Sequence, residues 1–522
     1  MRRSASALLI IAGALCATVL LMPGVVGAQV VPEVDGAVQV TSDLSETRGH
    51  ATPVMAVHPE SPGVLAVIEG DAYANRCTVH VSTNAGLSWV SRSPMDLPAP
   101  WSGCMFSTTG VIADLAFGQD GTLYAALSGF DPKTYHQRIF LARSSDLGER
   151  WELTELPWIE GNIPEGQSGG DALPSVVVDP SDPNRIHVAW WSNNGAWNLS
   201  EAITKGKRWC NDFVPRPWVA TSTDAGQTFS PPVDMAGDTP GCMTEPYLEV
   251  GNDGELFAFF GEATRGEDEG GTGAPSHLYV SVSRDGGETF TVSPIHEQDT
   301  EDGGDGDWLS APSPGIDRRS STLYVAWEDL GGEVPSIRFM RSADGGATWS
   351  QPISLNDEAP KRTWGFSEQF PSLNVAPNGR IDVAWYDWRN DVTFTEDAEE
   401  NNLQDVYSTY STDGGRTWSD NLRVNDRVID RRFGARKVGF ITGPVGLAST
   451  DDATYVAWDD TRNGNERTGT QDVYATRIRF TAPGDLFTPP GRPPLFWTAI
   501  GAAAALCVGG LVLLAGTAMA RR

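Results

Sequence analysis

The chain has 522 residues and a formal net charge of −30, from 68 acidic and 38 basic residues. So large a negative charge argues against nucleic acid and anionic membrane surfaces as binding partners, although an anionic sugar would need only a local basic pocket. Length alone would suggest about three or four domains.

Residues 1–28 have the features of a secretory signal peptide. Two arginines precede an apolar run from Ala7 to Met22, and small residues lead to a cleavage position near Ala28. We therefore expect an exported protein, in an environment where disulfide bonds persist.

A short motif, S-x-D-x-G-x-[T/S]-[W/F], recurs six times along the chain. The copies are residues 82–89, 144–151, 222–229, 283–290, 342–349 and 411–418. Its Asp, replaced by Asn in the first copy, can accept backbone N–H groups and close a turn. Its Gly permits the positive φ of a tight turn. These features favour a structural role over catalysis, and the regular recurrence indicates a repeat architecture.

This motif resembles the Asp-box, or bacterial neuraminidase repeat, of the sialidase superfamily. The resemblance covers most of the exported part and implies an all-β β-propeller of four-stranded blades. It is much less specific for activity, because function lies in particular sites rather than in a fold.

Each motif copy lies within a longer unit of four predicted strands. The second strand is the clearest, with examples at 123–127, 186–190, 256–260, 323–327, 380–385 and 454–458. Counting second strands gives seven units, and the last has neither the motif nor a fourth strand. We expect residues 36–41 to complete it, closing seven blades into one domain over residues 34–480. Six blades is the competing count.

The C-terminal end predicts a membrane anchor. Residues 481–494 are rich in proline and predict an extended stalk. Residues 495–520 are uncharged and long enough for a transmembrane helix, and the arginines at 521–522 place a short tail inside the cell. A buried core helix is the alternative, but all-β blades have no place for it. We expect the propeller on the extracytoplasmic side of the cell membrane.

Four cysteines of the exported part lie at equivalent positions of two units. Export and this equivalence favour the disulfides Cys77–Cys104 and Cys210–Cys242, although three connectivities are open in principle. Zinc is the alternative, but the spacings do not match a zinc site.

The longest insertions follow second and fourth strands, so we expect a functional site on the face where those loops emerge. Sialidases hold the substrate carboxylate with three converging arginines, and the candidates here are Arg265, Arg389 and Arg462. The alternative is that Arg389 pairs with Asp387 and Arg462 with Asp460. Repetition of Asp-x-Arg in two units favours these ion pairs.

The chain departs from the sialidase pattern at the first catalytic arginine. Ala51 stands where the Arg of an Arg-Ile-Pro motif is expected, and Arg48 is the nearby candidate to replace it. Sialidases also use a Tyr nucleophile with a Glu, and an Asp as acid and base. Candidates at the starts of first strands, which can point into a central funnel, are Glu245, Tyr247, Asp171 and Glu368. Solvated carboxylates or structural hydrogen bonds are the alternative.

Trp308 and Trp364 precede first strands and are candidate platforms for sugar rings. Packing between blades is an equal alternative. Asp302, Asp305 and Asp307 concentrate oxygen ligands suited to Ca²⁺. A solvated acidic loop is the alternative, and no cofactor is expected to be required.

The sequence therefore predicts a surface-anchored, sialidase-like propeller that binds a glycan or a cell-surface protein on its loop-rich face. The alternative is an exo-sialidase with a rearranged arginine cluster. The missing Arg-Ile-Pro motif favours the binding function.

Overall fold

The structure is a computed structural model. It describes residues 31–71, 73–74, 76–92, 96–103, 113–134, 136–158, 168–197, 215–263, 276–298, 312–329, 336–357, 368–391, 403–435 and 443–481. Contacts divide the chain into one large unit, Val34–Ile478, and a second unit that contains both ends. In the described ranges, no helix is long and apolar enough to cross a membrane. The predicted signal peptide and membrane helix lie outside these ranges.

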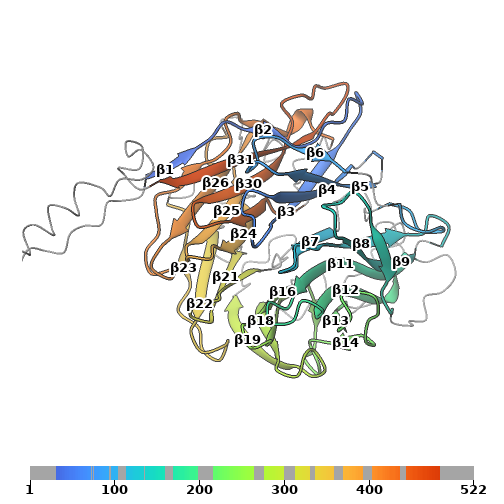
Figure 1. Ribbon diagram of the computed structural model, residues 1–522. Coiled ribbons are helices and arrows are strands. Elements are labelled where there is room, and N and C mark those ends of the chain that lie inside the picture. The colour runs from blue at the N-terminus through green and yellow to red at the C-terminus, as the bar shows by residue number, and fades with distance from the viewer. Residues whose placement is uncertain are drawn as a thin grey trace, which may run out of the picture. The chain divides into compact units, whose positions relative to one another are not determined.

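The large unit is built from antiparallel meanders (Figure 1). The first strands are β3 (His50–Val57), β7 (Ala113–Phe117), β11 (Ser168–Val178), β16 (Tyr247–Val250), β20 (Ser313–Asp317), β24 (Glu368–Val375) and β29 (Gly446–Ser449). The second strands are β4 (Leu65–Asp71), β8 (Leu123–Phe130), β12 (Ile186–Trp197), β17 (Leu256–Ala263), β21 (Thr322–Asp329), β25 (Ile381–Asp387) and β30 (Ala453–Asp460).

Third and fourth strands complete the meanders toward the outside. The third strands are β5 (Arg76–Ser82), β9 (His136–Ser144), β13 (Arg216–Ser222), β18 (Ser276–Ser283), β22 (Ser336–Ser342), β26 (Leu403–Ser411) and β31 (Asp472–Thr481). The fourth strands are β6 (Val90–Ser91), β10 (Glu152–Glu155), β14 (Val233–Asp234), β19 (Thr291–Gln298), β23 (Ile353–Ser354) and β27 (Leu422–Arg423). Short additions are β1 (Val31–Val34), β15 (Cys242–Met243), β28 (Ile429–Asp430) and the 3-10 helix η3 (Arg431–Phe433).

The first strands contact one another in chain order, and β29 contacts β3, so the cycle of contacts closes. Two successive meanders are joined into one eight-stranded sheet, where β11 pairs in parallel with β9. The closing strand β2 (Val38–Gln39) pairs with β31, with Val38 opposite Ala475. The predicted completion of the last unit by residues 36–41 is therefore confirmed.

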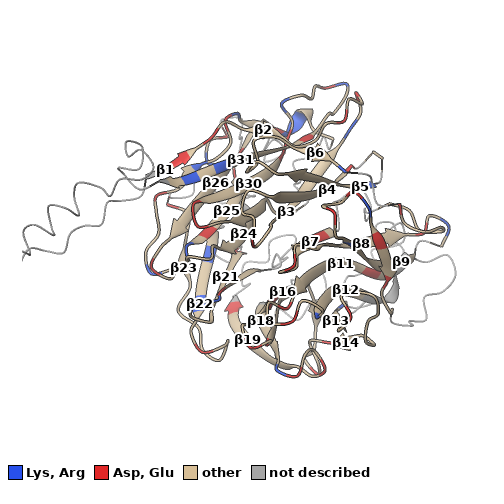
Figure 2. Cartoon of the chain, in the orientation of Figure 1, with Lys and Arg blue, Asp and Glu red and all other residues tan. Residues whose placement is uncertain are grey.

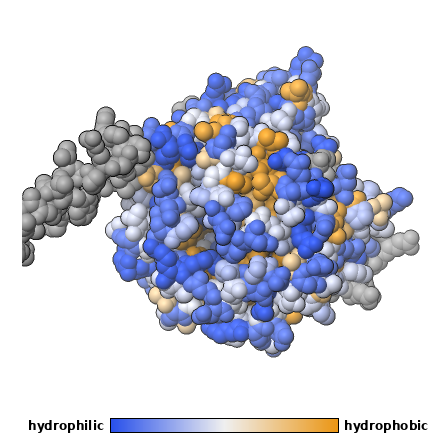
Figure 3. Space-filling model, viewed as in Figure 1, coloured by the Kyte–Doolittle hydropathy of each residue, from blue (hydrophilic) through white to orange (hydrophobic). Residues whose placement is uncertain are grey.

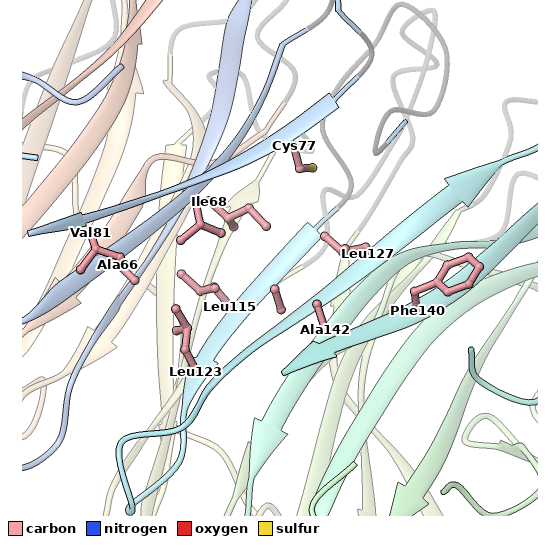
Figure 4. Packing of buried hydrophobic residues seen from close by; sticks show 11 residues of the cluster. Ala66, Ile68, Cys77, Val81, Leu115, Leu123, Leu127, Phe140 and Ala142 are labelled. Atoms are coloured by element: carbon pink, nitrogen blue, oxygen red, sulfur yellow. The ribbon is translucent and has the colours of Figure 1, made fainter. Parts of the chain in front are cut away.

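Apolar side chains fill the space between neighbouring meanders. Figure 4 shows one such layer, in which Ile68 and Val81 of the first meander pack with Leu115, Leu127 and Phe140 of the second. Because each meander buries both of its faces against neighbours, the repeats form one core rather than several domains.

The six repeat turns form the hydrogen bonds that the motif predicts. In residues 222–229, Asp224 Oδ1 accepts from Thr228 N at 2.8 Å, and Oδ2 accepts from the Thr228 hydroxyl at 2.6 Å. Ser222 Oγ accepts from Gly226 N at 2.8 Å. Equivalent bonds occur in the other five turns, with Asn84 in the first.

These bonds explain the electrostatics of the turns. The threonine hydroxyl and amide at the end of each turn lower the pKa of Asp224, Asp285 and Asp344 to about 2. The predicted structural role of the repeated aspartates is confirmed.

Charged residues are spread over strands and loops, with acidic residues frequent among them (Figure 2). The face shown in Figure 3 is mostly hydrophilic, and apolar residues gather in patches, one of them near its middle.

Candidate functional site

Each first strand contributes one residue to a layer of equivalent positions. We define this layer by the residue that pairs with the same middle position of the neighbouring second strand. We name Val54, Asp114, Ser175, Tyr247, Ser313, Ser372 and Gly446 the inner layer. Several of its side chains join neighbouring strands: Ser313 Oγ accepts from Leu373 N at 2.9 Å, and Ser372 Oγ donates to Val445 O at 2.6 Å. Small side chains at this level therefore have a structural use.

Two members of the inner layer differ from the rest: Asp114 carries a carboxyl group, and Tyr247 has a large side chain. Asp114 Oδ2 accepts from Val176 N at 2.8 Å, the same kind of strand-to-strand bond that the serines form. Tyr247 is the largest side chain of the layer and is half-buried. Glu245 precedes it by two residues and Glu249 follows it by two, so all three project to the same side of the strand.

These groups influence one another electrostatically. The charge of Asp114 acts on both Tyr247 and Glu249, and the charge of Glu245 acts on Tyr247. We name Asp114, Glu245, Tyr247 and Glu249 the inner acidic cluster. It joins two residues predicted from the sequence, Glu245 and Tyr247, with two that were not predicted.

Withdrawal from water raises the pKa of every member of the inner acidic cluster. The pKa of Glu249 rises to about 7 and that of Asp114 to about 6, and Arg318, 3.8 Å from Glu249, opposes the first shift. Burial also raises the pKa of Glu245 and keeps the Tyr247 phenol protonated. Near neutral pH the cluster can therefore offer a protonated carboxyl group and a phenol as donors.

Asp171 is placed by β11 but is not in contact with this cluster through any bond described here. It is buried, with 3 % exposure, and hydrogen-bonded to Ser192. Burial raises its pKa to about 6, and the charge of Arg138 opposes that shift. The Arg138 guanidinium in turn lies over the Trp158 ring, 3.7 Å from its centre.

Arg389 and Arg462 form the ion pairs that were the alternative to a carboxylate clamp. Arg389 NH2 lies 2.8 Å from Asp387 Oδ2, and Arg462 NH2 lies 2.7 Å from Asp460 Oδ2. Each guanidinium also reaches a further aspartate and covers a tyrosine ring at 4.0 Å. This repeated brace ties the end of a second strand to its neighbours. Convergence with Arg265, which lies outside the described residues, stays a prediction.

Arg48 is also held in a double ion pair, with Nε 2.6 Å from Asp472 Oδ1 and NH2 2.8 Å from Asp472 Oδ2. Glu368 begins β24 opposite Asp387, and its side chain lies outside the described residues. Cys77 and Cys242 are buried. Several other predicted residues also lie outside the described ranges, so their roles and the cysteine pairing stay predictions: Trp308, Trp364, Asp302, Asp305, Asp307, Cys104 and Cys210.

A second buried polar cluster surrounds Asp459. Its carboxylate accepts hydrogen bonds from Tyr386, from Arg431 of η3 and from Gln471. Arg431 Nε also donates to Gln404 Oε1 at 2.8 Å. All five residues are buried and bond to one another, which is typical of a structural network, although the Gln404 Nε2 atom has no hydrogen-bond partner within the described residues.

A surface depression of about 580 Å³ is lined by Tyr279 of β18, by Phe290, Val292 and Pro294, and by residues 236–240. It lies along the outer strands and does not include the inner acidic cluster. The perturbed carboxyl groups make the cluster the stronger candidate for chemistry.

Sequence reasoning missed Asp114 and Glu249. Aligning the units on their second strands would have found Asp114, since it occupies the level of Ser175, Ser313 and Ser372. The sequence did not point to Glu249, because a lone glutamate within a predicted strand is normally interpreted as a solvent-exposed side chain.

No protein-family model matches the chain. A xyloglucanase of Hypocrea jecorina is 27 % identical over 307 residues, which are 51 % of this chain and 35 % of the relative. A sialidase of Bacteroides fragilis is 34 % identical over 108 residues, 19 % of either chain. The chain thus spans about a third or less of the curated relatives it matches.

Among solved structures, the Hadza microbial sialidase aligns with a TM-score of 0.45 and 17 % identity, over 81 % of this chain and 74 % of that one. The sequence relatives are glycoside hydrolases. Their matched segments, the six repeat turns and the closed cycle of first strands support the expected all-β fold, and the chain resembles the sialidase-superfamily propellers.

Proposed function

We propose that this protein is an exported propeller of seven four-stranded blades, anchored by residues 495–520, that binds a carbohydrate at its inner acidic cluster. The observation that carries the proposal is that Tyr247 and Asp114 lie at a level where the other first strands have small uncharged side chains, with Glu249 two residues beyond Tyr247. Carboxyl groups and a phenol hydrogen-bond sugar hydroxyls, and an aromatic ring also packs against a sugar face.

A neutral glycan is favoured over a sialic acid. Arg389, Arg462 and Arg48 are all engaged by aspartates, and Ala51 provides no charge. We therefore expect no release of sialic acid from a fluorogenic sialoside at ordinary enzyme turnover. Release that is abolished by Arg389→Ala or Arg462→Ala would promote the exo-sialidase alternative, with Arg48 as the substitute arginine.

Hydrolysis of the bound glycan is the second candidate function, because the raised pKa of Glu249, about 7, suits a general acid. The matched xyloglucanases point to β-glucans with side-chain sugars as a first substrate panel.

The test is binding and reducing-sugar release with neutral and sialylated oligosaccharides. Tyr247→Phe and Glu249→Gln should weaken binding about ten- to a hundredfold, since hydrogen bonds to charged or buried partners contribute about 1.5–3 kcal/mol. Glu255→Gln, in the turn after the same strand, is the matched control. Binding that is unchanged in both cluster variants would contradict the proposal.

A further inference from the structure

Three side chains able to hold a cation meet where the closing segment joins the first meander. Asp43 follows β2, His50 begins β3 and Asp71 ends β4. One ligand atom from each residue lies within 4.8 Å of the other two. They come from three separate stretches of backbone, so their approach depends on the fold rather than on one acidic loop.

His50 is oriented in the manner of a metal ligand. Its side chain is 5 % exposed, and its Nδ1 lies 2.8 Å from Glu69 Oε2. Its buried Nε2 has no hydrogen-bond partner within the described ranges and lies 3.9 Å from Asp43 Oδ2. A buried ring nitrogen without a partner is costly. An imidazole with a carboxylate on one nitrogen and a free second nitrogen is the usual state of a metal-binding histidine.

Glu69 is itself fixed by a second histidine. Its Oε1 lies 3.0 Å from His80 Nε2, and His80 Nδ1 lies 2.9 Å from the Ser91 hydroxyl. Glu69 has 0 % exposure. The carboxylate that orients His50 is therefore held in place by buried contacts.

Two of the other meanders have a charged partner that Asp71 lacks. It occupies the position of Asp387 and Asp460, each of which pairs with an arginine two residues later. Two residues after Asp71 comes Tyr73, whose N–H donates to Asp71 Oδ1 at 2.9 Å but whose side chain carries no positive charge. The first meander keeps the carboxylate of the brace and lacks its guanidinium.

We propose that Asp43, His50 and Asp71 bind a divalent transition-metal ion in place of that guanidinium, with Glu69 as the positioning residue for His50. One imidazole nitrogen and two carboxylates suit zinc or manganese. The Asp43 side chain is 35 % exposed, so the ion can enter from solvent and water can complete its coordination.

The site would link the segment after β2 to β3 and β4. The same segment is tied to the last meander by Arg48 and by Thr41, whose hydroxyl donates to Asp472 at 3.1 Å. An ion bound here therefore holds the closure of the ring, and its binding stabilises the folded protein.

The experiment uses the full-length protein, stripped with a chelator, dialysed and supplied with Zn²⁺, Mn²⁺ or Ca²⁺. We expect about one zinc ion per chain and a higher thermal midpoint with zinc. Asp43→Asn should retain less than about a tenth of the metal, and Glu69→Gln should weaken affinity about 10–100-fold. Glu46→Gln, exposed in the same segment, is the matched control and should bind as the parent does.

Three results would overturn the site. The first is a parent protein that neither retains metal nor changes its midpoint, which would mean that a proton on His50 suffices. The second is metal binding that persists in Asp43→Asn and in His50→Gln. Loss of the ion on substitution of Asp302 and Asp305 instead would assign binding to that loop and equally refute the proposal.

Discussion

The repeat turns and the inner acidic cluster contain the same chemical group in opposite states. In the turns, a threonine hydroxyl and amide meet each aspartate and lower the pKa of Asp224, Asp285 and Asp344 to about 2. In the cluster, desolvation raises the pKa of Asp114 to about 6, and desolvation together with the charge of Asp114 raises that of Glu249 to about 7.

The difference teaches that burial without a hydrogen-bonded cation marks the candidate site in this protein, since Asp114 also accepts from Leu115 N and Val176 N. A carboxylate that stays in water and accepts hydrogen bonds keeps its charge, whereas one that is withdrawn from water without a bonded cation favours its neutral form. The aspartates of the strand-end braces belong with the turns, because Asp387 accepts from Arg389 and from Trp385 Nε1 at 3.0 Å.

The comparison fails most clearly if an aspartate that is bonded to an arginine can be removed without lowering the free energy of unfolding. The substitution Asp387→Ala removes a carboxylate that pairs with the Arg389 guanidinium, and the Arg389 side chain is only 7 % exposed. We expect a loss of about 3–5 kcal/mol of unfolding free energy, as for other broken buried pairs. Denaturant unfolding measures it, and exposed Asp420→Ala should leave stability near that of the parent. A loss below about 1 kcal/mol would contradict the assignment.

A repeat turn should show a smaller effect. Ser222→Ala removes the acceptor of the Gly226 N–H in a buried position. The expected cost is about 1–3 kcal/mol, the penalty of a buried donor without a partner. Thr223→Ala, exposed in the same turn, is the control. Equal stability of the two variants would show that the turn tolerates loss of this bond.

The pH dependence of stability tests the other half of the comparison, the raised pKa of Glu249 in the inner acidic cluster. Because the folded pKa of Glu249 is raised to about 7, its contribution is present below the unfolded pKa of about 4.3 and is lost as pH rises toward 7. Relative to Glu249→Gln, the parent should therefore lose about 1–2 kcal/mol between these pH values, since the side chain stays 21 % exposed. Parallel pH profiles for parent and variant would exclude the raised pKa, and Glu255→Gln serves as the control.

The repeat turns and the second strands could be predicted because they depend on residues that are close together in the sequence. In residues 222–229, for example, Ser222, Asp224, Gly226 and Thr228 bond within eight residues, so spacing alone specifies the turn. The pairing of residues 36–41 with β31 was predictable as well, because the last unit lacked a fourth strand and an unpaired edge demands a partner.

The sequence by itself determined the repeat, the all-β class and the structural role of the box aspartates, since these depend on neighbours along the chain. Only the tertiary structure decided which carboxyl groups meet. Asp114 and Tyr247 lie in different units, and Asp43 comes from the closing segment to meet His50 and Asp71, which pair across the β3–β4 hairpin. The pKa of such groups depends on burial and on charges brought in from other strands, and neither is written in local sequence.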